Sequence, residues 1–439
     1  MGKWKVASLT GVSLLCAGAI AGPAFASGVH ASKVAKKDSQ PVTVTLLTWE
    51  NPQTNHQIML SLQKFEKANP GIKIQLVPSP LQNYGTKLNS MIAAGQAPDI
   101  FEVGNDMEQQ WGAQGLLYNY LPLARSIKGF LPHFFPGAIP NWLENGNLFG
   151  LPSLMNVYGI FYNKTLFEKA HVPFPKVGWT YQQMMNDAQK LSSNKGGVHQ
   201  YGLYNTADSP FNLSVYSVSA GGMPFTNSIT SATMVTAGPQ FVQGVELFKK
   251  YIQSGAITPP AFDNSNDESL FLEGKLPMWA AGQWNAEQMI GPGSPKNLQW
   301  GYVPNPIVKK ASTIFDSVGW ASPKTMKDPA VVFKVIKYLD TTQYAQSLPG
   351  APVAPPAYQP SSLPYYNTLK AAGHSGMITG LNWMLHSPNK QAVRFLETWA
   401  TQANQFITAD WNNVLTGQAP ISTLQQMVKQ INSIIQSSH

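Results

Sequence analysis

Three short apolar segments, separated by two segments with helical spacing, constrain the fold of this chain most strongly. Val42, Val44 and Leu46 alternate with their neighbours and predict a strand that ends near Trp49. The predicted order is a strand at 42–48, a helix around 58–65, a strand at 72–76, a helix around 88–92 and a strand at 98–103. This alternation indicates an α/β fold with a parallel sheet.

Polar and aromatic residues follow two of these predicted strands. Trp49-Glu50-Asn51 comes after the first strand, and Gly104-Asn105-Asp106 comes after the third. In parallel α/β sheets, ligands bind at the carboxyl ends of the strands. We therefore expect these two segments to contribute to a binding site.

The rest of the chain continues with mixed strands and helices. The predicted strands lie at 159–162, 277–281, 302–306 and 317–322, and the predicted helices at 166–170, 181–191, 241–252, 267–272, 331–339, 391–414 and 421–435. Residues 348–364 are rich in proline and predict a loop or crossover. A chain of roughly 400 residues after residue 26 exceeds what one core usually organises, so we expect two domains.

The first 26 residues have the pattern of a secretory signal peptide. Two lysines precede an apolar run, and Ala24-Phe25-Ala26 offers a cleavage site, so residues 27–41 would form a flexible tether. Cys16 is the only cysteine; Leu15 stands before it where a lipobox has a small residue, which argues against a lipid anchor. Cleavage after Ala26 would remove this cysteine and with it any disulfide or thiol chemistry.

The charge composition argues against nucleic acid as a partner. The formal net charge is +8, but charged residues are only 12% of the chain, and Arg125 and Arg394 are the only arginines. Phosphate and base recognition depend on arginine and on dense basic blocks, which the sequence lacks. The scarcity of acids suits acidic surroundings, a hypothesis that requires an unchanged melting temperature between pH 7 and pH 4.

An ordered series of segments resembles the extracytoplasmic solute-binding proteins of ABC importers, in particular the group that contains the maltose-binding proteins. The matching segments are Phe65-Glu66-Lys67-Ala68-Asn69-Pro70-Gly71-Ile72, Gly95-Gln96-Ala97-Pro98-Asp99-Ile100, Gly115-Leu116-Leu117, Tyr158-Gly159-Ile160-Phe161-Tyr162-Asn163-Lys164, Trp179-Thr180, Gly221-Gly222, Phe271-Leu272-Glu273-Gly274-Lys275 and Gly282-Gln283-Trp284. They cover essentially the whole chain after the tether, in order.

The resemblance implies a two-lobed periplasmic-binding-protein fold, each lobe with a mostly parallel sheet flanked by helices. It implies an N-terminal lobe of residues 42–152 and 307–350 and a C-terminal lobe of residues 153–306 and 351–439. The chain would cross between the lobes near 152–156, 304–310 and 348–355. It also implies a monomer that closes on an oligosaccharide and presents it to the ABC permease subunits at the membrane.

The resemblance and the strand-end pattern together give a set of expected ligand-binding residues. These are Trp49, Glu50, Asn51, Asn105, Asp106, Asn156, Tyr158, Phe211, Trp284, Trp320 and Trp383. Trp284 would stack on a sugar ring, although a tryptophan there could also pack in the core or between lobes. Asn51 before Pro52 also fits a helix cap, and Trp320 could face the ligand or the hinge. Val103 and Asn156 depart from the maltose-binding type, which has tryptophan and glutamate there.

Other functions stay open at this point. Glu50, Asp106 and Glu287 could supply the two carboxylates of a secreted glycoside hydrolase. Glycerol-phosphate-like compounds, peptides and polyamines are alternative ligands. The sequence has no catalytic signature of the zinc-protease, lipase, P-loop or dinucleotide-binding type, and its eight histidines lack metal-like spacing. We expect no enzyme activity, no cofactor and no metal.

Overall fold

Three parallel strands come first in the computed structural model, which describes residues 41–204, 207–228, 233–262, 265–291, 293–341, 353–387, 390–392 and 398–437. Strand β1 (Val42–Thr48) pairs in parallel with β2 (Ile72–Pro78) on one side and with β3 (Ile100–Gly104) on the other. Helices α1 (Pro52–Ala68) and α2 (Leu81–Ala93) connect them. The predicted parallel α/β arrangement is confirmed here. The predicted signal peptide with Cys16, nearly all of the tether, Arg394 and residues 342–352 lie outside the described residues.

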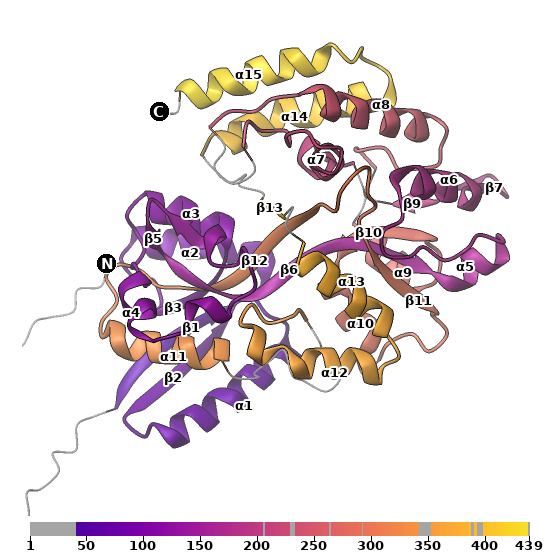
Figure 1. The fold of residues 1–439 in the computed structure, drawn as a ribbon. Coiled ribbons are helices and arrows are strands. Elements are labelled where there is room, and N and C mark those ends of the chain that lie inside the picture. The colour runs from indigo at the N-terminus through magenta and orange to yellow at the C-terminus, as the bar shows by residue number, and fades with distance from the viewer. Residues whose placement is uncertain are drawn as a thin grey trace, which may run out of the picture. The chain divides into compact units, whose positions relative to one another are not determined.

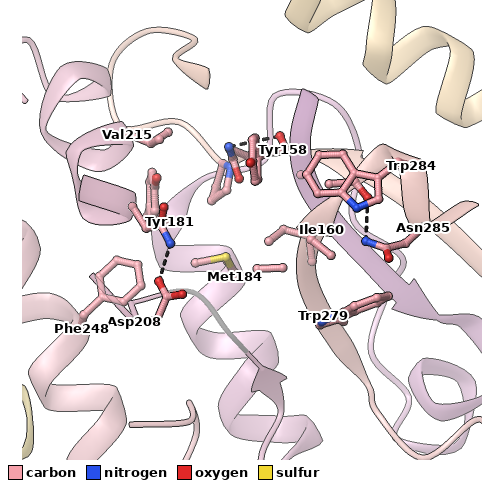
Figure 2. A pocket seen from close by; sticks show the side chains of 17 residues that line it. Tyr158, Ile160, Tyr181, Met184, Asp208, Val215, Phe248, Trp279, Trp284 and Asn285 are labelled. Carbon is pink, nitrogen blue, oxygen red and sulfur yellow. Dashed lines mark hydrogen bonds between the residues drawn. The ribbon is translucent and has the colours of Figure 1, made fainter. Parts of the chain in front are cut away.

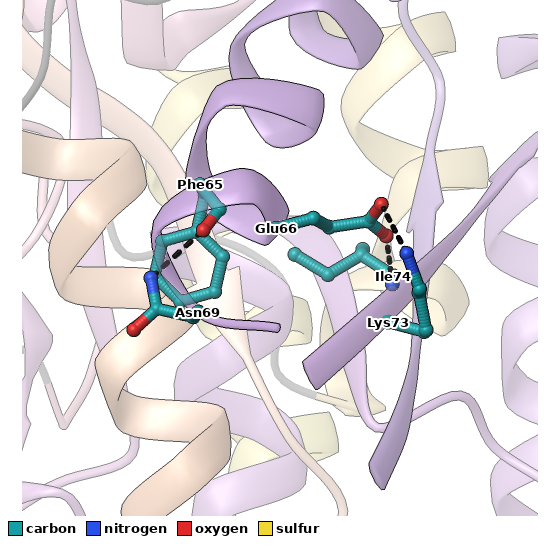
Figure 3. A network of polar contacts seen from close by, with 5 residues as sticks. All are labelled: Phe65, Glu66, Asn69, Lys73 and Ile74. Carbon is teal, nitrogen blue, oxygen red and sulfur yellow. Dashed lines mark hydrogen bonds and ion pairs between the residues drawn. The ribbon is translucent and has the colours of Figure 1, made fainter. Parts of the chain in front are cut away.

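Helix α1 begins and ends with local hydrogen bonds that the sequence supplies. Asn51 caps it by accepting a hydrogen bond from the Thr54 amide, and Pro52 occupies the first turn. At the other end, Glu66 accepts bonds from the Ile74 amide (2.6 Å) and from the Lys73 ammonium (3.4 Å) (Figure 3). These contacts fix the direction in which β2 leaves the helix.

One long strand belongs to two groups of strands. The first half of β6 (Gly150–Asn163) pairs with β12 (Thr313–Ala321), which pairs in turn with β3, all antiparallel. The second half of β6 pairs antiparallel with β10 (Met278–Gly282) and with β11 (Trp300–Pro304). The change of partners falls at Val157 and Tyr158, which pair with Phe315 and Gly282 respectively.

The remaining elements surround these strands (Figure 1). The other strands are β4 (Leu143–Glu144), β5 (Asn147–Leu148), β7 (Ser193–Lys195), β8 (Val198–Gln200), β9 (Leu203–Tyr204) and β13 (Lys390–Ala392). The other α-helices are α3 (Asn105–Ala113), α4 (Leu121–Ser126), α5 (Lys164–Lys169), α6 (Tyr181–Leu191), α7 (Pro210–Ser219), α8 (Pro239–Gln253), α9 (Asp267–Leu272), α10 (Ala286–Ile290), α11 (Pro329–Thr341), α12 (Leu363–Ala371), α13 (Ser375–Leu385), α14 (Thr398–Thr416) and α15 (Thr423–Ser437). Short 3-10 turns are η1 (Leu131–His133), η2 (Pro140–Trp142), η3 (Gln283–Asn285) and η5 (Gln359–Ser361).

Residues 41–439 form one compact unit that contains two hydrophobic cores. The first core lies around β1, β3, α1 and α11 and continues beneath α12 and α13. The second lies around α6, α8, α14 and α15. Strand β6 contributes to both, because Phe161 packs in the first core and Ile160 in the second.

Some elements differ from the prediction. The expected helix at 391–414 begins only at Thr398, and Lys390–Ala392 forms β13 against β12. Helices α3, α4, α7, α10, α12 and α13 were not predicted from the sequence. Of these, α12 begins within a proline-rich stretch and α13 carries apolar residues on most of its surface. Across the described ranges, we find no helix that combines the length and the apolar character needed to cross a bilayer.

Candidate functional site

A pocket of about 250 Å³ lies between β6, β10, α6, α7 and α8 (Figure 2). Its aromatic lining residues are Tyr158, Tyr181, Phe248, Trp279 and Trp284. Its polar lining residues include Asp208, Asn212, Asn285 and Asn305. A pocket that combines aromatic rings with a few amides and a carboxylate is typical of a small-molecule binding site.

Strand β10 ends at Gly282, and Trp284 follows in the turn η3. This turn places the indole of Trp284 at the rim of the pocket. A Cβ atom on Gly282 would come within 1.9 Å of the Trp284 ring, so only glycine leaves room for the indole to fold back over the backbone. The ring meets Tyr158 edge to face, with centroids 5.2 Å apart and planes at 89°. Trp284 is partly exposed.

The residue between Gly282 and Trp284 is buried and bonded to β6. Gln283 has 0% exposure; its Oε1 accepts a hydrogen bond from the Val157 amide (2.5 Å), and its Nε2 donates to the Met155 carbonyl (3.2 Å). These two bonds anchor the turn that carries Trp284.

Polar groups on the pocket wall are held by hydrogen bonds to nearby groups of the protein. Asn212 in the first turn of α7 donates to the Asp208 carboxylate, Asn285 donates to the Gly282 carbonyl (3.0 Å), and Asn305 donates to the Tyr158 carbonyl (3.3 Å). The surrounding protein removes part of the water around Asp208 and thereby raises its pKa, although much of its side chain is solvent-accessible. The hydrogen bond from Asn212 lowers this pKa and partly offsets the increase. Among the described lining residues, Asp208 is the only one with a charged side chain.

The predicted residues at the end of β1 lie beside a second group of side chains. The ring of Trp49 packs edge-on against Tyr84 at 4.9 Å. Asn51 caps α1 through Oδ1, which was the alternative to ligand binding, while its Nδ2 donates to Glu287 in α10 (3.2 Å). Thr54 Oγ1 also lies 3.4 Å from Glu287. These bonds join the end of β1 to the helix that follows Trp284.

Glu50 forms a carboxyl pair that sequence reasoning missed. Its partner is Glu102 in β3, which is 2% exposed and also accepts a hydrogen bond from the Trp49 amide (3.2 Å). Burial raises the pKa of Glu102 well above its ordinary range, and the neighbouring Glu50 raises it further. Burial raises the pKa of Glu50 to about 7, partly offset by the hydrogen bond to Glu102. A hydrogen bond between two carboxyl groups requires that one of them is protonated, which the raised pKa of each group favours.

Several other predicted residues do not line the pocket. Trp320 is 1% exposed in the first core, because strand alternation in β12 directs its ring inward, so we leave it out of the site. Trp383 in α13 packs partly buried against the same core. Asn156 donates to Asp316 on the paired strand (3.4 Å). Phe211 packs against Phe225 at 5.5 Å, next to the pocket residue Asn212.

Of the eleven predicted residues, Tyr158 and Trp284 line the pocket. Asn105 and Asp106 begin α3 directly after β3, and nothing is described of their side chains, so their expected role in binding stays a prediction. The missed residues Tyr181 and Phe248 come from predicted helices that were assigned no part in the site. Asn305 lies in the predicted crossing at 304–310, and Asn285 directly follows the predicted ligand residue Trp284. The sequence could therefore have indicated both asparagines as site residues.

Trp179 and Thr180 have structural roles at the start of α6. Thr180 forms a capping box with Gln183 at the start of α6, and the Trp179 indole donates to the Pro304 carbonyl (2.8 Å). Within the ranges described above, His, Cys, Asp and Glu side chains form no group of three or more that could hold a metal ion.

Comparison with known proteins gives consistent matches. The family described as bacterial extracellular solute-binding protein matches residues 51–346. Binding proteins from Brucella abortus and Brucella suis are 25% identical over 295 residues, and the chain spans 65% of their length. The galactooligosaccharide-binding protein of Bacillus subtilis is 24% identical over 319 residues, which is 72% of each chain.

Solved structures share the fold. An ABC substrate-binding protein from Listeria monocytogenes in complex with cycloalternan superposes with a TM-score of 0.74 at 21% identity, covering 90% of this chain and 98% of that one. A Streptomyces glaucescens receptor studied with acarbose gives 0.70 at 18% identity, covering 91% and 99%. The likeness confirms the expected two-lobed α/β fold class.

Proposed function

Because the chain belongs to the bacterial extracellular solute-binding protein family, we propose that it is the substrate-binding protein of an ABC sugar importer. The proposed ligand is an oligosaccharide, with one sugar residue in the pocket beside Trp284. The observation that carries the proposal is the Trp284 indole, held over Gly282 and braced by Tyr158 at the rim of a pocket with amide and carboxylate groups.

The chemistry of the pocket suits a pyranose. A sugar ring has an apolar C–H face that packs on an indole, and hydroxyls at its edge that need donors and acceptors. Asp208 can accept from hydroxyl groups, and Asn212, Asn285 and Asn305 can donate or accept. The pocket is slightly smaller than the ~300–1,000 Å³ common for ligand sites. Further sugar units would therefore extend beyond it.

The end of β1 is the proposed continuation of the site. Asn51 bonds to Glu287, three residues after Trp284, so the segment Trp49-Glu50-Asn51 lies near the turn that carries the indole. Trp49 and Glu50, with Asn105 and Asp106 at the end of β3, would meet the further sugar units. Asn156, Phe211 and Trp383 are assigned no direct contact in this proposal.

Closure of two lobes is part of the proposal. The change of partners along β6 at Val157 and Tyr158 lies just after the expected crossing at 152–156, and it supports the proposal that this strand is one link between the lobes. A ligand that contacts both lobes would stabilise the closed form. The importer permease would then bind that form, outside the cytoplasm, after export by the predicted signal peptide.

The names of relatives support a saccharide over other ligands. They include a galactooligosaccharide-binding protein, a maltotriose-binding protein and a maltodextrin-binding protein. An anionic ligand such as a glycerol phosphate would need a basic partner, and the described lining residues include no lysine, arginine or histidine. A polyamine remains compatible with Asp208, Glu50 and the aromatic rings.

A thermal-shift screen with neutral mono- and oligosaccharides tests the proposal, because a ligand that binds the folded state raises the melting temperature. We expect at least one neutral oligosaccharide to raise it, and the Trp284→Ala variant to lose that response. A response to spermidine alone would favour polyamine binding. Release of new reducing ends during incubation would instead favour a glycoside hydrolase.

A further inference from the structure

Four backbone groups on one edge of β6 need hydrogen-bond partners where the strand changes from one neighbouring strand to another. The N–H and C=O groups of Met155 and Val157 point away from β12 at this place. The Met155 amide donates to the Pro355 carbonyl (2.9 Å), and the Val157 carbonyl accepts from the Tyr302 hydroxyl (2.9 Å). The two remaining groups, the Met155 carbonyl and the Val157 amide, both bond to Gln283.

Gln283 therefore replaces a stretch of neighbouring strand. Gly282 pairs with Tyr158, so the next backbone pair in register would join Gln283 to Val157. The backbone instead turns into η3, and the carboxamide supplies the acceptor and the donor that a continuing strand would have offered. The backbone is thereby free to turn and carry Trp284 to the pocket rim.

We propose that Gln283 is a positioning residue, whose carboxamide fixes the indole of Trp284 and ties it to β6 at the point where that strand changes partners. The residue has no part in contacting a ligand, because it is fully buried. A shorter amide would not span from η3 to β6, and an apolar side chain would leave the Met155 carbonyl and the Val157 amide buried without partners. The inference deepens the proposed function, but it is tested on the protein without ligand.

The experiment is fluorine NMR of protein labelled with 5-fluorotryptophan, with the Trp284 resonance assigned by its loss in Trp284→Phe. Gln283→Met keeps side-chain length and removes both hydrogen bonds, so we expect the Trp284 resonance to move or broaden while that of Trp49 stays in place. Gln288→Met makes the same change at an exposed position five residues later and should leave Trp284 unchanged.

Rescue by a conservative variant separates hydrogen bonding from packing. At pH 5, a buried neutral glutamic acid at this position keeps one donor and one acceptor, so Gln283→Glu should hold the Trp284 resonance closer to its wild-type position than Gln283→Met does. Equal effects of the two variants, or an unmoved resonance in Gln283→Met, would overturn the proposal.

Hydrogen exchange on the wild-type protein tests the same inference if both variants fail to fold. The Val157 amide should exchange as slowly as the amides of the paired strands β6 and β10. Fast exchange at Val157 would contradict the bond to Gln283 and with it the proposed role.

Discussion

The indole of Trp284 stands perpendicular to the phenol ring of Tyr158, with their centroids 5.2 Å apart. This contact limits the rotation of the indole. A rigid aromatic platform reduces the entropy lost when a sugar ring packs on it.

Removing this platform should weaken saccharide binding and leave the fold intact. For Trp284→Ala we expect a loss of about 1 to 3 kcal/mol, roughly 5- to 150-fold in Kd, from lost contact area and stacking geometry. Isothermal calorimetry with the saccharide found in the thermal-shift screen measures this loss. Phe174→Ala, which removes an exposed aromatic side chain, is the control. Wild-type affinity in Trp284→Ala would contradict the proposed site.

The glycine before this turn should be needed for the same reason. A methyl group at position 282 would overlap the Trp284 ring, since the nearest ring atom lies 1.9 Å from the added Cβ. Gly282→Ala should therefore displace the indole and reduce affinity at least tenfold. Gly85→Ala in α2 adds its methyl group where no atom lies within 4 Å and should be neutral or stabilising by about 0.5 to 1 kcal/mol. Calorimetry and thermal melting of both variants make the comparison.

The charge of the pocket should discriminate between saccharides. Asp208 supplies the negative charge of the described lining, so a saccharide that carries a uronic acid should bind more weakly than its neutral counterpart at pH 7.5. Asp208→Asn should reduce that difference, while Glu246→Gln, an exposed acid on α8, should not. Equal preference in the wild type and in Asp208→Asn would show that the charge of Asp208 does not select the ligand.

Buried carboxyl groups should make the fold more stable in mild acid than at alkaline pH. Among the described residues, limited access of water raises the pKa of seven fully or partly shielded carboxyls, which are Glu50, Glu102, Asp187, Asp208, Glu268, Glu287 and Asp340. The folded state then binds more protons than the unfolded state. Stability is therefore lost as the pH rises from the unfolded pKa through the folded pKa.

Glu102 and Asp340 dominate this effect because they are 2% and 1% exposed. Burial lowers the pKa of His374 to about 4, which opposes the trend below pH 6.5 by one group. We expect a higher melting temperature at pH 5 than at pH 8, and a smaller difference in Glu102→Gln. A melting temperature that falls between pH 8 and pH 5 would contradict this prediction.

Local patterns in the sequence predicted the elements that depend on nearby residues. The strands β1, β2 and β3 follow from alternation, and the cap at Asn51 follows from Asn-Pro. Each of these features is decided within a few residues, so a single sequence carries it.

Contacts between distant segments could not be predicted in the same way. The Gln283 side chain bonds to Val157, which is 126 residues away, and Glu50 pairs with Glu102 on a separate strand. Tyr181 and Phe248 meet in the pocket only because α6 and α8 pack together. Trp320 was expected at the ligand, and the register of β12 instead directs it into the core.

The two polar atoms of the Asn51 side-chain amide bond to two different helices. The oxygen holds the first turn of α1, and the nitrogen reaches Glu287 in α10. Replacing Glu287 by an apolar residue would thus cut the connection between these helices and leave the start of α1 as it is. Substitutions at position 287 can in this way change how strongly α10 is held against α1, while the cap at the start of α1 is preserved.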